Sequence, residues 1–523
     1  MKKIILFYLA LTCALNIYSI PTTILDKKLH STILNKSLHR AIRHLDITKI
    51  EKALKEGANP HAQNIYSESP LRVIIRMVGA LSIDYNHEPI YSINRYPGAK
   101  IASCYKIFKL LIAHGANTKE KDLEQNTLLH YAAKAGWVKG VLELLEHGVD
   151  KNATNKLLET PLHLAIKYNH VAASKILISA GADLHKKTYI EQETPLHIAC
   201  DKNLQEIVAD IIRHRVSINA QNIRKETPFH IATRTNSLEI VRLLLFAGAA
   251  AYIENSYGEN PLHIACSRGN TKIAQALVNW GAPLNSQNYK NQSPLHLATD
   301  NNWPQITKFL ISRGANINIQ DQNGNTPLHT ACLRSNLPIV SQLIIRGANV
   351  NAQNKLNATP LHVATWEGVS EIMQLLIGHG ADATTKTSTG ANCLHVLASA
   401  NPKFKKSSHR LERLLIKKIT NLNEQDNNGN TPLHIAIFAQ NNQLAARLVA
   451  HKADLNIQNR SGETALHEAA HSGNVAGIKL LLKHGANRTI QNSAGKTAIN
   501  IVQEQPESKI NPKTREQIKK LLL

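Results

Sequence analysis

The sequence predicts an all-α solenoid built from stacked helix–turn–helix units. The prediction rests on a four-residue motif that recurs and on the constant spacing of its copies. Thr-Pro-Leu-His occurs in full at 160–163, 194–197, 326–329, 359–362 and 431–434. Related tetrapeptides extend the series to about fourteen copies, and most successive copies begin 33 residues apart. Such a period indicates one repeat array rather than the three or four domains that 523 residues would otherwise suggest.

Each unit carries signals for two helices. The proline of the motif suits the first turn of a helix, where its missing N–H leaves no hydrogen bond unmade, and the preceding Thr can cap that turn. An apolar stripe at i, i+3 and i+4 follows, for example Val241, Leu244 and Leu245. Most units then reach a Gly-Ala pair, in which the glycine can adopt the left-handed conformation that ends a helix. The predicted unit is therefore a short helix, a turn, a second helix and an extended turn.

Thr-Pro-Leu-His-x-Ala, followed about twenty residues later by Gly-Ala-Asp/Asn-x-Asn, closely resembles the ankyrin repeat. The resemblance covers residues 36–500. It implies paired antiparallel helices with β-turn fingers projecting at one edge, and units that are stable only when stacked on their neighbours. It also implies that the motif histidine ties the turns between units by hydrogen bonds.

The two ends of the chain depart from the period. Met1-Lys2-Lys3, an apolar run at 4–15 and the small residue Ser19 predict a secretory signal peptide at residues 1–19. An uncleaved anchor reaching Ile20 is the alternative. Residues 20–35 then form a lead-in to the array at 36–500, and residues 501–523 form a polar cap and tail.

Two insertions interrupt the array, near residues 79–103 and 400–406. The first holds several prolines and tyrosines. Insertions in repeats often lie on the binding face, but loop entropy also tolerates a surface loop without function. The second adjoins a unit that lacks both the motif proline and the Gly-Ala pair, so we expect a weak joint there.

The positions of the histidines and cysteines indicate structural roles rather than catalysis. Twelve histidines, from His39 to His467, occupy the same motif position. Helix packing separates neighbouring copies by about 10 Å, whereas zinc needs several ligands at about 2 Å. The six cysteines include Cys200, Cys266 and Cys332, which recur two repeats apart and are expected to be buried rather than paired. No phosphate loop, metalloprotease motif or nucleophile elbow occurs, so we expect no catalytic residues, no metal and no cofactor.

The sequence predicts a partner-binding surface instead. By the resemblance, partners meet the fingertips and the exposed face of each first helix. Counting from the motifs gives these candidate residues: Lys134, Lys167, Tyr168, Lys202, Arg234, Tyr257, Arg268, Tyr289, Arg334 and Trp366. Tyr, Trp and Arg dominate interface hot spots. We therefore expect a basic and aromatic groove in the middle units, roughly 127–370. The alternative is a solvated basic face, because lysine and arginine (61) outnumber aspartate and glutamate (38) in a chain of net charge +23.

Three functions remain open at this stage. The first is an exported protein–protein interaction module that grips an acidic surface, effector-like in a host-associated bacterium. The second is binding of nucleic acid or an acidic polymer through the basic groove, although no nucleic-acid motif appears. The third is a structural spacer of the cell envelope. We expect a secreted or periplasmic monomer without stable membrane insertion after cleavage.

Overall fold

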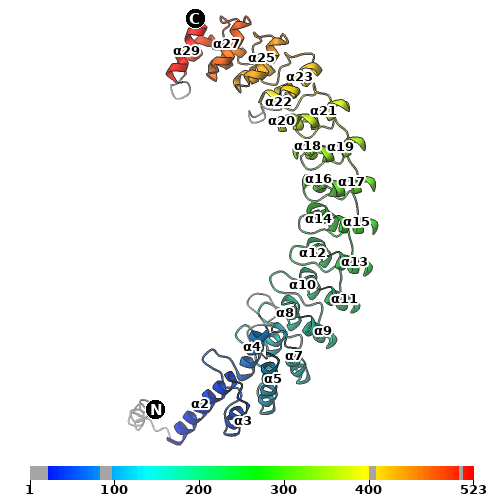
Figure 1. The fold of residues 1–523 in the computed structure, drawn as a ribbon, viewed down its shortest axis with the longest axis vertical. Coiled ribbons are helices and arrows are strands. Elements are labelled where there is room, and N and C mark those ends of the chain that lie inside the picture. Colours follow the sequence, from blue (N-terminus) through cyan, green and yellow to red (C-terminus); the bar gives the residue numbers. More distant parts are fainter. Residues whose placement is uncertain (1–21, 83–96, 400–407, 506–510) are drawn as a thin grey trace. The chain divides into compact units, whose positions relative to one another are not determined.

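The computed structural model describes residues 22–82, 97–399, 408–505 and 511–523. The predicted signal peptide at 1–19 and the second insertion at 400–406 lie outside the described residues. Regular structure in the described residues is helical, apart from one isolated bridge between Lys121 and Thr127. The helices follow one another in pairs along the chain (Figure 1). The predicted all-α class and the helix–turn–helix unit are thereby confirmed.

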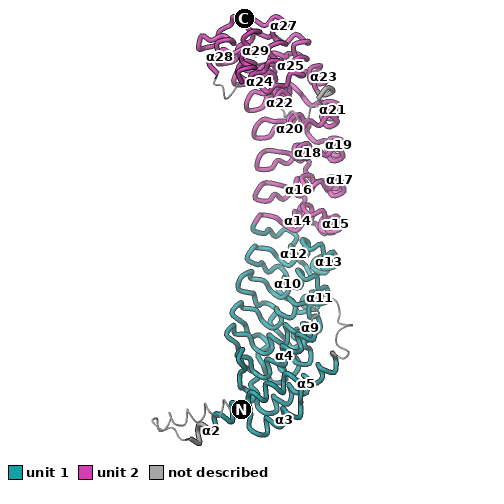
Figure 2. The backbone as a smooth tube through the Cα atoms, turned by 60° about the vertical axis from the view of Figure 1, so that its left-hand side comes forward, with its two compact units in different colours: residues 1–256 teal, residues 257–523 magenta. Residues whose placement is uncertain are grey.

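The chain divides into two compact units, residues 1–256 and 257–523 (Figure 2). Unit 1 holds α2 (Thr22–Arg43), α3 (Ile47–Lys55), α4 (Pro70–Ser82), α5 (Pro97–Ala113), α6 (Leu128–Lys134), α7 (Val138–Glu146), α8 (Pro161–Lys167), α9 (Val171–Ser179), α10 (Pro195–Asp201), α11 (Gln205–Arg213), α12 (Pro228–Arg234) and α13 (Leu238–Phe246). Unit 2 holds α14 (Pro261–Arg268), α15 (Thr271–Asn279), α16 (Pro294–Asp300), α17 (Pro304–Ser312), α18 (Pro327–Leu333), α19 (Leu337–Ile345), α20 (Pro360–Glu367), α21 (Ser370–Gly378), α22 (Cys393–Ser399), α23 (Ser408–Lys418), α24 (Pro432–Phe438), α25 (Asn442–Ala450), α26 (Ala465–His471), α27 (Val475–Lys483), α28 (Ala498–Glu504) and α29 (Pro512–Leu522).

The pair α8 and α9 shows how the motif residues build a repeat. Thr160 caps α8 by accepting the backbone N–H of His163, and Pro161 occupies the first helical position. Gly181 follows α9 with φ +77°, the left-handed conformation that closes a helix at little cost only in glycine. First helices pack on first helices, as α6 on α8, and second helices on second helices, as α7 on α9. The apolar stripes of each pair are buried between neighbours, so packing between repeats forms the core.

The extended turns form fingers that hydrogen-bond to one another through their backbones. In unit 1, the N–H of Tyr189 donates to the carbonyl of Leu157 at 2.8 Å, and the N–H of Ile223 donates to that of Glu191 at 2.9 Å. In unit 2, the N–H of Tyr289 donates to the carbonyl of Tyr257 at 3.0 Å. These bonds fix the spacing of the fingers, and with it the spacing of the side chains that the fingers carry.

The irregular segments are more helical than predicted. Residues 22–35 of the lead-in continue into the first repeat as the 22-residue helix α2. Of the predicted insertion, residues 79–82 extend α4 to 13 residues and residues 97–103 open the 17-residue α5; residues 83–96 lie outside the described residues. The predicted array ends at residue 500, but packing continues to Leu522, because Ile518 and Leu522 give α29 a buried apolar face against α28 and α27.

Candidate partner-binding surface

The motif histidines hold the surface in place. The Nδ1 atom of His163 accepts the backbone N–H of Thr160 at 3.1 Å, and its Nε2 lies 3.2 Å from the carbonyl oxygen of Lys186. A carbonyl oxygen only accepts, so Nε2 carries the proton of the neutral ring. His130 ties its repeat to the next in the same way, through the carbonyl of Glu159 at 3.0 Å. Burial lowers the pKa of His163 to about 4. These histidines are therefore structural, as the resemblance implies.

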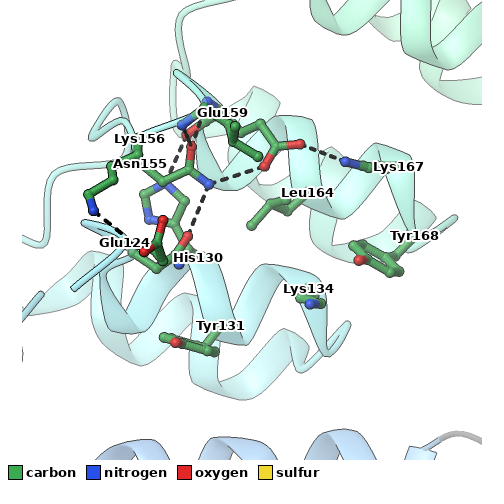
Figure 3. Close-up of a pocket in the computed structure, with 12 residues that line it drawn as sticks. Glu124, His130, Tyr131, Lys134, Asn155, Lys156, Glu159, Leu164, Lys167 and Tyr168 are labelled. Carbon is green, nitrogen blue, oxygen red and sulfur yellow. Dashed lines mark hydrogen bonds and ion pairs between the residues drawn. The ribbon is translucent and has the colours of Figure 1, made fainter. Parts of the chain in front are cut away.

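Three adjoining cavities in unit 1 form a continuous groove beside the first helices, here called the unit 1 groove. Their volumes are about 510 Å³ between α4 and α6, about 310 Å³ between α6 and α8 (Figure 3), and about 280 Å³ between α8 and α10. The first and second cavities share Tyr131, Lys134 and Tyr168. The second and third share Leu157, Glu159 and Lys167. The cavities thus have common walls.

The groove contains four of the residues predicted from the sequence. Lys134, Lys167 and Tyr168 line the second cavity, where Figure 3 shows them at the ends of α6 and α8. Lys202 lines the third cavity. Lys134 also stands over the ring of Tyr168, with its Nζ 5.1 Å from the ring centroid. This geometry is that of a cation–π contact. Arg234 is the last residue of α12, which packs on α10, and it does not line the three cavities.

The predicted basic stripe is balanced by carboxylates. Lys167 Nζ lies 2.7 Å from Glu159, and Lys202 Nζ lies 3.6 Å from Asp201. Arg234 reaches Asp201 at 3.9 Å and Glu226 at 3.7 Å. Lys167, Lys202 and Arg234 therefore do not form a run of free positive charge, because acidic groups of the fingers and helix ends face them. No ion pair joins Lys134 or Arg268 to another residue in the described part of the chain.

The acidic members of the groove were missed from the sequence, although a signal for them exists. Glu159, Glu193 and Glu226 each stand directly before a Thr-Pro motif, so they recur with the period. Although burial opposes it, hydrogen bonding from Lys167 helps to lower the pKa of Glu159. The pKa of Glu193 is instead raised by burial and by the nearby Asp201 carboxylate. The carboxylates therefore crowd one another at the α10 end of the groove.

Aromatic walls give the α4 end of the groove its shape. The hydroxyl of Tyr131 donates to Asp122, and the guanidinium of Arg72 stacks over the Tyr131 ring at 5.4 Å from its centroid. Burial and the Asp122 carboxylate raise the pKa of Tyr131 to about 12, so it stays a neutral donor. Where α4 meets α6, a Cβ on Gly79 would lie 3.3 Å from that of Ala135, so small residues form the floor.

The predicted residues of unit 2 lie on exposed positions. Tyr257 and Tyr289 are fingertip side chains with 65% and 64% of their surface exposed, and Trp366 near the end of α20 is 56% exposed. Arg268 ends α14 and is exposed. Arg334 follows α18 and pairs with Asp300 at 2.9 Å. Charge pairing between adjacent repeats therefore recurs here.

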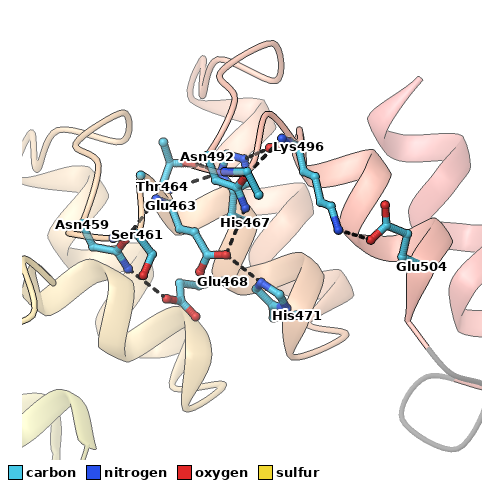
Figure 4. Close-up of polar contacts among 12 residues, drawn as sticks. Asn459, Ser461, Glu463, Thr464, His467, Glu468, His471, Asn492, Lys496 and Glu504 are labelled. Carbon is cyan, nitrogen blue, oxygen red and sulfur yellow. Dashed lines mark hydrogen bonds and ion pairs between the residues drawn. The ribbon is translucent and has the colours of Figure 1, made fainter.

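A second polar cluster lies in unit 2 on α26 and the neighbouring fingers (Figure 4). Glu463 accepts from the ring of His471 at 2.9 Å. The side chain of Glu468 accepts a hydrogen bond from Asn459 at 3.4 Å. Burial, assisted by the Glu463 carboxylate, raises the pKa of Glu468 to about 7. This carboxyl group therefore takes up and releases its proton near neutral pH.

Three features of the described residues concern metal binding, thiol reactivity and membrane crossing. No group of three or more His, Cys, Asp or Glu side chains among them is arranged to hold a metal ion. The five cysteines among them are buried free thiols, and burial raises the pKa of Cys104 to about 11. Within the same residues, no helix has the length and apolar character that crossing a bilayer requires.

The comparisons with known proteins agree with the geometry. A family model for ankyrin repeats, in blocks of three copies, matches residues 99–188, 183–255, 246–321, 295–387 and 394–492. The chain belongs to the ankyrin-repeat family. Ankyrin repeats suggest a protein–protein interaction module, and no enzyme family matches.

This ankyrin-repeat protein is similar to short stretches of several known chains. It is 37% identical over 103 residues to an ankyrin repeat protein of Rickettsia bellii, covering 19% of this chain and 56% of that protein. It is 41% identical over 88 residues to the ankyrin repeat protein FPV222 of Fowlpox virus, covering 16% and 12%. It is 35% identical over 97 residues to alpha-latrotoxin-Lg1a of Latrodectus geometricus, covering 18% and 7%. The chain thus spans less than two thirds of each relative, and the similarity concerns the repeats alone.

Proposed function

We propose that this ankyrin-repeat protein binds a segment of another protein in the unit 1 groove. The observation that carries the proposal is the shared walls of the three cavities, which offer one continuous site. Tyr131, Tyr168 and Leu157 supply apolar and aromatic surface, and paired charges form the rim. Interfaces combine such aromatic anchors with polar groups that fix orientation.

The charge pairing favours a protein over nucleic acid as the partner. Nucleic-acid binding draws its affinity from cations that neutralise phosphates. In the groove, Lys167 and Lys202 already face carboxylates at 2.7 and 3.6 Å, so phosphates would meet acidic groups as well. A partner segment with side chains of both signs matches this surface better than a uniformly acidic surface does.

The experiment is capture from a host or cell lysate with residues 21–523 as bait, followed by affinity measurement on the partner identified. Replacing Tyr131 and Tyr168 with alanine removes the aromatic wall of the first two cavities. Phe246→Ala is the matched control, because Phe246 is an aromatic residue at the end of α13, outside the groove and 76% exposed. We expect the partner to bind the wild type and the control equally and the groove variant at least tenfold more weakly. Equal binding by all three would refute the assignment to this groove.

We also propose that the protein is exported as a monomer and acts on a host protein in an effector-like role. The support for export is the order of basic, apolar and small residues at 1–19; the monomeric state and the effector-like role rest on analogy with the ankyrin-repeat family alone. Expression with and without this segment, followed by N-terminal sequencing of the exported chain, tests the proposal. An N-terminus at Ile20 supports cleavage, whereas retention of Met1 in a membrane fraction supports the anchor instead.

A further inference from the structure

A cavity of about 640 Å³ lies between α2 and the first finger. We propose that this cavity, here called the α2 cavity, binds a phosphate-bearing ligand. Its residues come from α2 and the turn after it (Thr32, Asn35, Lys36, His39, Arg40, Arg43, His44) and from the finger (Ala62, Gln63, Asn64, Ile65).

The cations of the α2 cavity form no ion pair within the described part of the chain. Lys36, Arg40 and Arg43 all line it and are exposed, and no ion pair joins any of them to another described residue. Two acidic side chains act electrostatically on histidines that line the cavity, Glu68 on His39 and Asp46 on His44, and both already have basic partners. Asp46 pairs with Lys49 at 2.7 Å, and Glu68 pairs with Arg76 at 2.8 Å. This arrangement is the opposite of the unit 1 groove, where carboxylates balance the cations.

The spacing of the cations places them on one side of α2. Residues 36, 40 and 43 follow one another at i, i+4 and i+7, so their side chains project from the same helix face. A guanidinium group binds phosphate through two parallel hydrogen bonds. Two arginines and a lysine around one cavity therefore match a group with several charged oxygens better than a single carboxylate.

His39 gives an independent indication of a missing partner. Its Nε2 lies 2.6 Å from the carbonyl oxygen of Ala62, a contact like those of His130 and His163, but its Nδ1 is buried and has no hydrogen-bond partner in the described part of the chain. In the other repeats, the N–H of the capping residue satisfies this atom. Here the equivalent residue, Lys36, lies inside α2, so its N–H belongs to the helix.

The side chain of His39 is only 7% exposed, so an unsatisfied nitrogen there is costly. Burial lowers the pKa of His39, Arg43 adds to this effect, and the Ala62 carbonyl and Glu68 oppose it. An anion beside the ring would stabilise the protonated form, in which Nδ1 donates. The cavity therefore combines three exposed cations with a buried histidine whose Nδ1 has no partner in the described part of the chain.

The test is titration of the full chain with inositol trisphosphate by calorimetry, and sedimentation with phosphatidylcholine vesicles that do or do not contain phosphatidylinositol bisphosphate. Citrate serves as the polycarboxylate control. The proposal expects inositol trisphosphate, or the phosphoinositide vesicles, to bind at least tenfold more tightly than citrate or plain vesicles. Binding to the soluble ligand identifies a free phosphorylated compound, and binding to the vesicles alone identifies a lipid headgroup.

Variants locate the binding. Arg40→Gln and Arg43→Gln keep good helix formers at exposed positions, so we expect the fold to persist and each affinity to fall about tenfold. Arg242→Gln is the matched control, because Arg242 is an exposed arginine on α13, far along the chain. Binding of citrate as tight as that of the phosphates, a control variant weakened as much as the others, or no binding of either phosphate probe would overturn the proposal. Loss of the partner in the groove variant above does not bear on it.

Discussion

The neutral motif histidines make the folded array sensitive to acid, and His163 offers the sharpest test. Both of its ring nitrogens are engaged while the ring is neutral. Burial lowers its pKa from 6.5 to about 4. Between these values the unfolded chain binds more protons than the folded chain, so stability falls as the pH falls through this window. A shift of this size corresponds to about 3 kcal/mol, at about 1.4 kcal/mol per pH unit.

The substitution is His163→Asn, because asparagine (Asn500) naturally occupies the histidine position in the last repeat. There the side-chain oxygen of Asn500 lies 3.0 Å from the backbone nitrogen of Thr497, so the cap is kept without a titrating group. The variant loses the hydrogen bond to Lys186, which we expect to cost about 1–3 kcal/mol at pH 7. Between pH 7 and pH 4.5 the wild type loses about 2–3 kcal/mol that the variant does not lose. The stability advantage of the wild type over His163→Asn at pH 7 should therefore disappear or reverse at pH 4.5.

The assay is amide hydrogen exchange of peptides from α8 and α9, with wild type and variant compared at the same pH so that intrinsic exchange rates cancel. It reports the local opening free energy, which suits an array whose repeats need not unfold together. Ile178→Val is the control, because it removes one buried methylene from α9 without changing any charge. A difference between His163→Asn and wild type that stays constant from pH 7 to pH 4.5 would refute the reasoning.

Three further predictions follow from single contacts. Because the pKa of Glu468 is raised to about 7 in the folded chain, its deprotonation destabilises the fold as the pH rises from 4.5 to 7. In urea denaturation, Glu468→Gln should therefore leave the free energy of unfolding unchanged at pH 4 and raise it by about 1–2 kcal/mol at pH 8. Gly324→Ala should cost about 1–3 kcal/mol by the same measurement, because φ is +77° and a Cβ would lie 2.8 Å from the backbone nitrogen of Lys355; an unchanged midpoint would contradict this. Phe229→Ala should cost about 3–5 kcal/mol, because the side chain is fully buried, and a loss below 1 kcal/mol would show that the repeat repacks.

The repeat fold could be predicted because its signals lie within single units. Thr160, Pro161 and His163 form one helix start within four residues, and each copy repeats the same information. The extent of the irregular helices could not be predicted in the same way. The helix α2 runs through the position where the other repeats place a cap, because Lys36 stands there in place of Thr or Ser. The 33-residue period gives no information on the length of a helix that replaces a cap.

The pairing of basic and acidic side chains at the candidate site could not be predicted either, for a related reason. Arg234 and Asp201 belong to different repeats, as do Arg334 and Asp300. Whether they meet depends on the lateral spacing of the first helices and on the rotamers of long side chains. The sequence places a cation on each helix face, but only packing shows which carboxylate stands opposite. Comparing the same position in adjacent units finds Asp201 opposite Arg234, but it misses the second pair, because Asp300 lies four residues after its motif histidine and Arg334 lies five after the next one.

The net charge of +23 acts differently at the two proposed sites, because carboxylates pair with cations in the unit 1 groove but not in the described residues of the α2 cavity. A partner that enters the unit 1 groove must replace water around pairs such as Lys167 and Glu159 and supply hydrogen bonds to both members. Desolvating such pairs offsets much of their attraction, so they favour specificity over affinity. Arg40 and Arg43 in the α2 cavity carry no such pairing among the described residues, so long-range attraction of anions acts there. Binding in the α2 cavity should therefore weaken steeply with salt, whereas binding in the groove should depend on shape and change little.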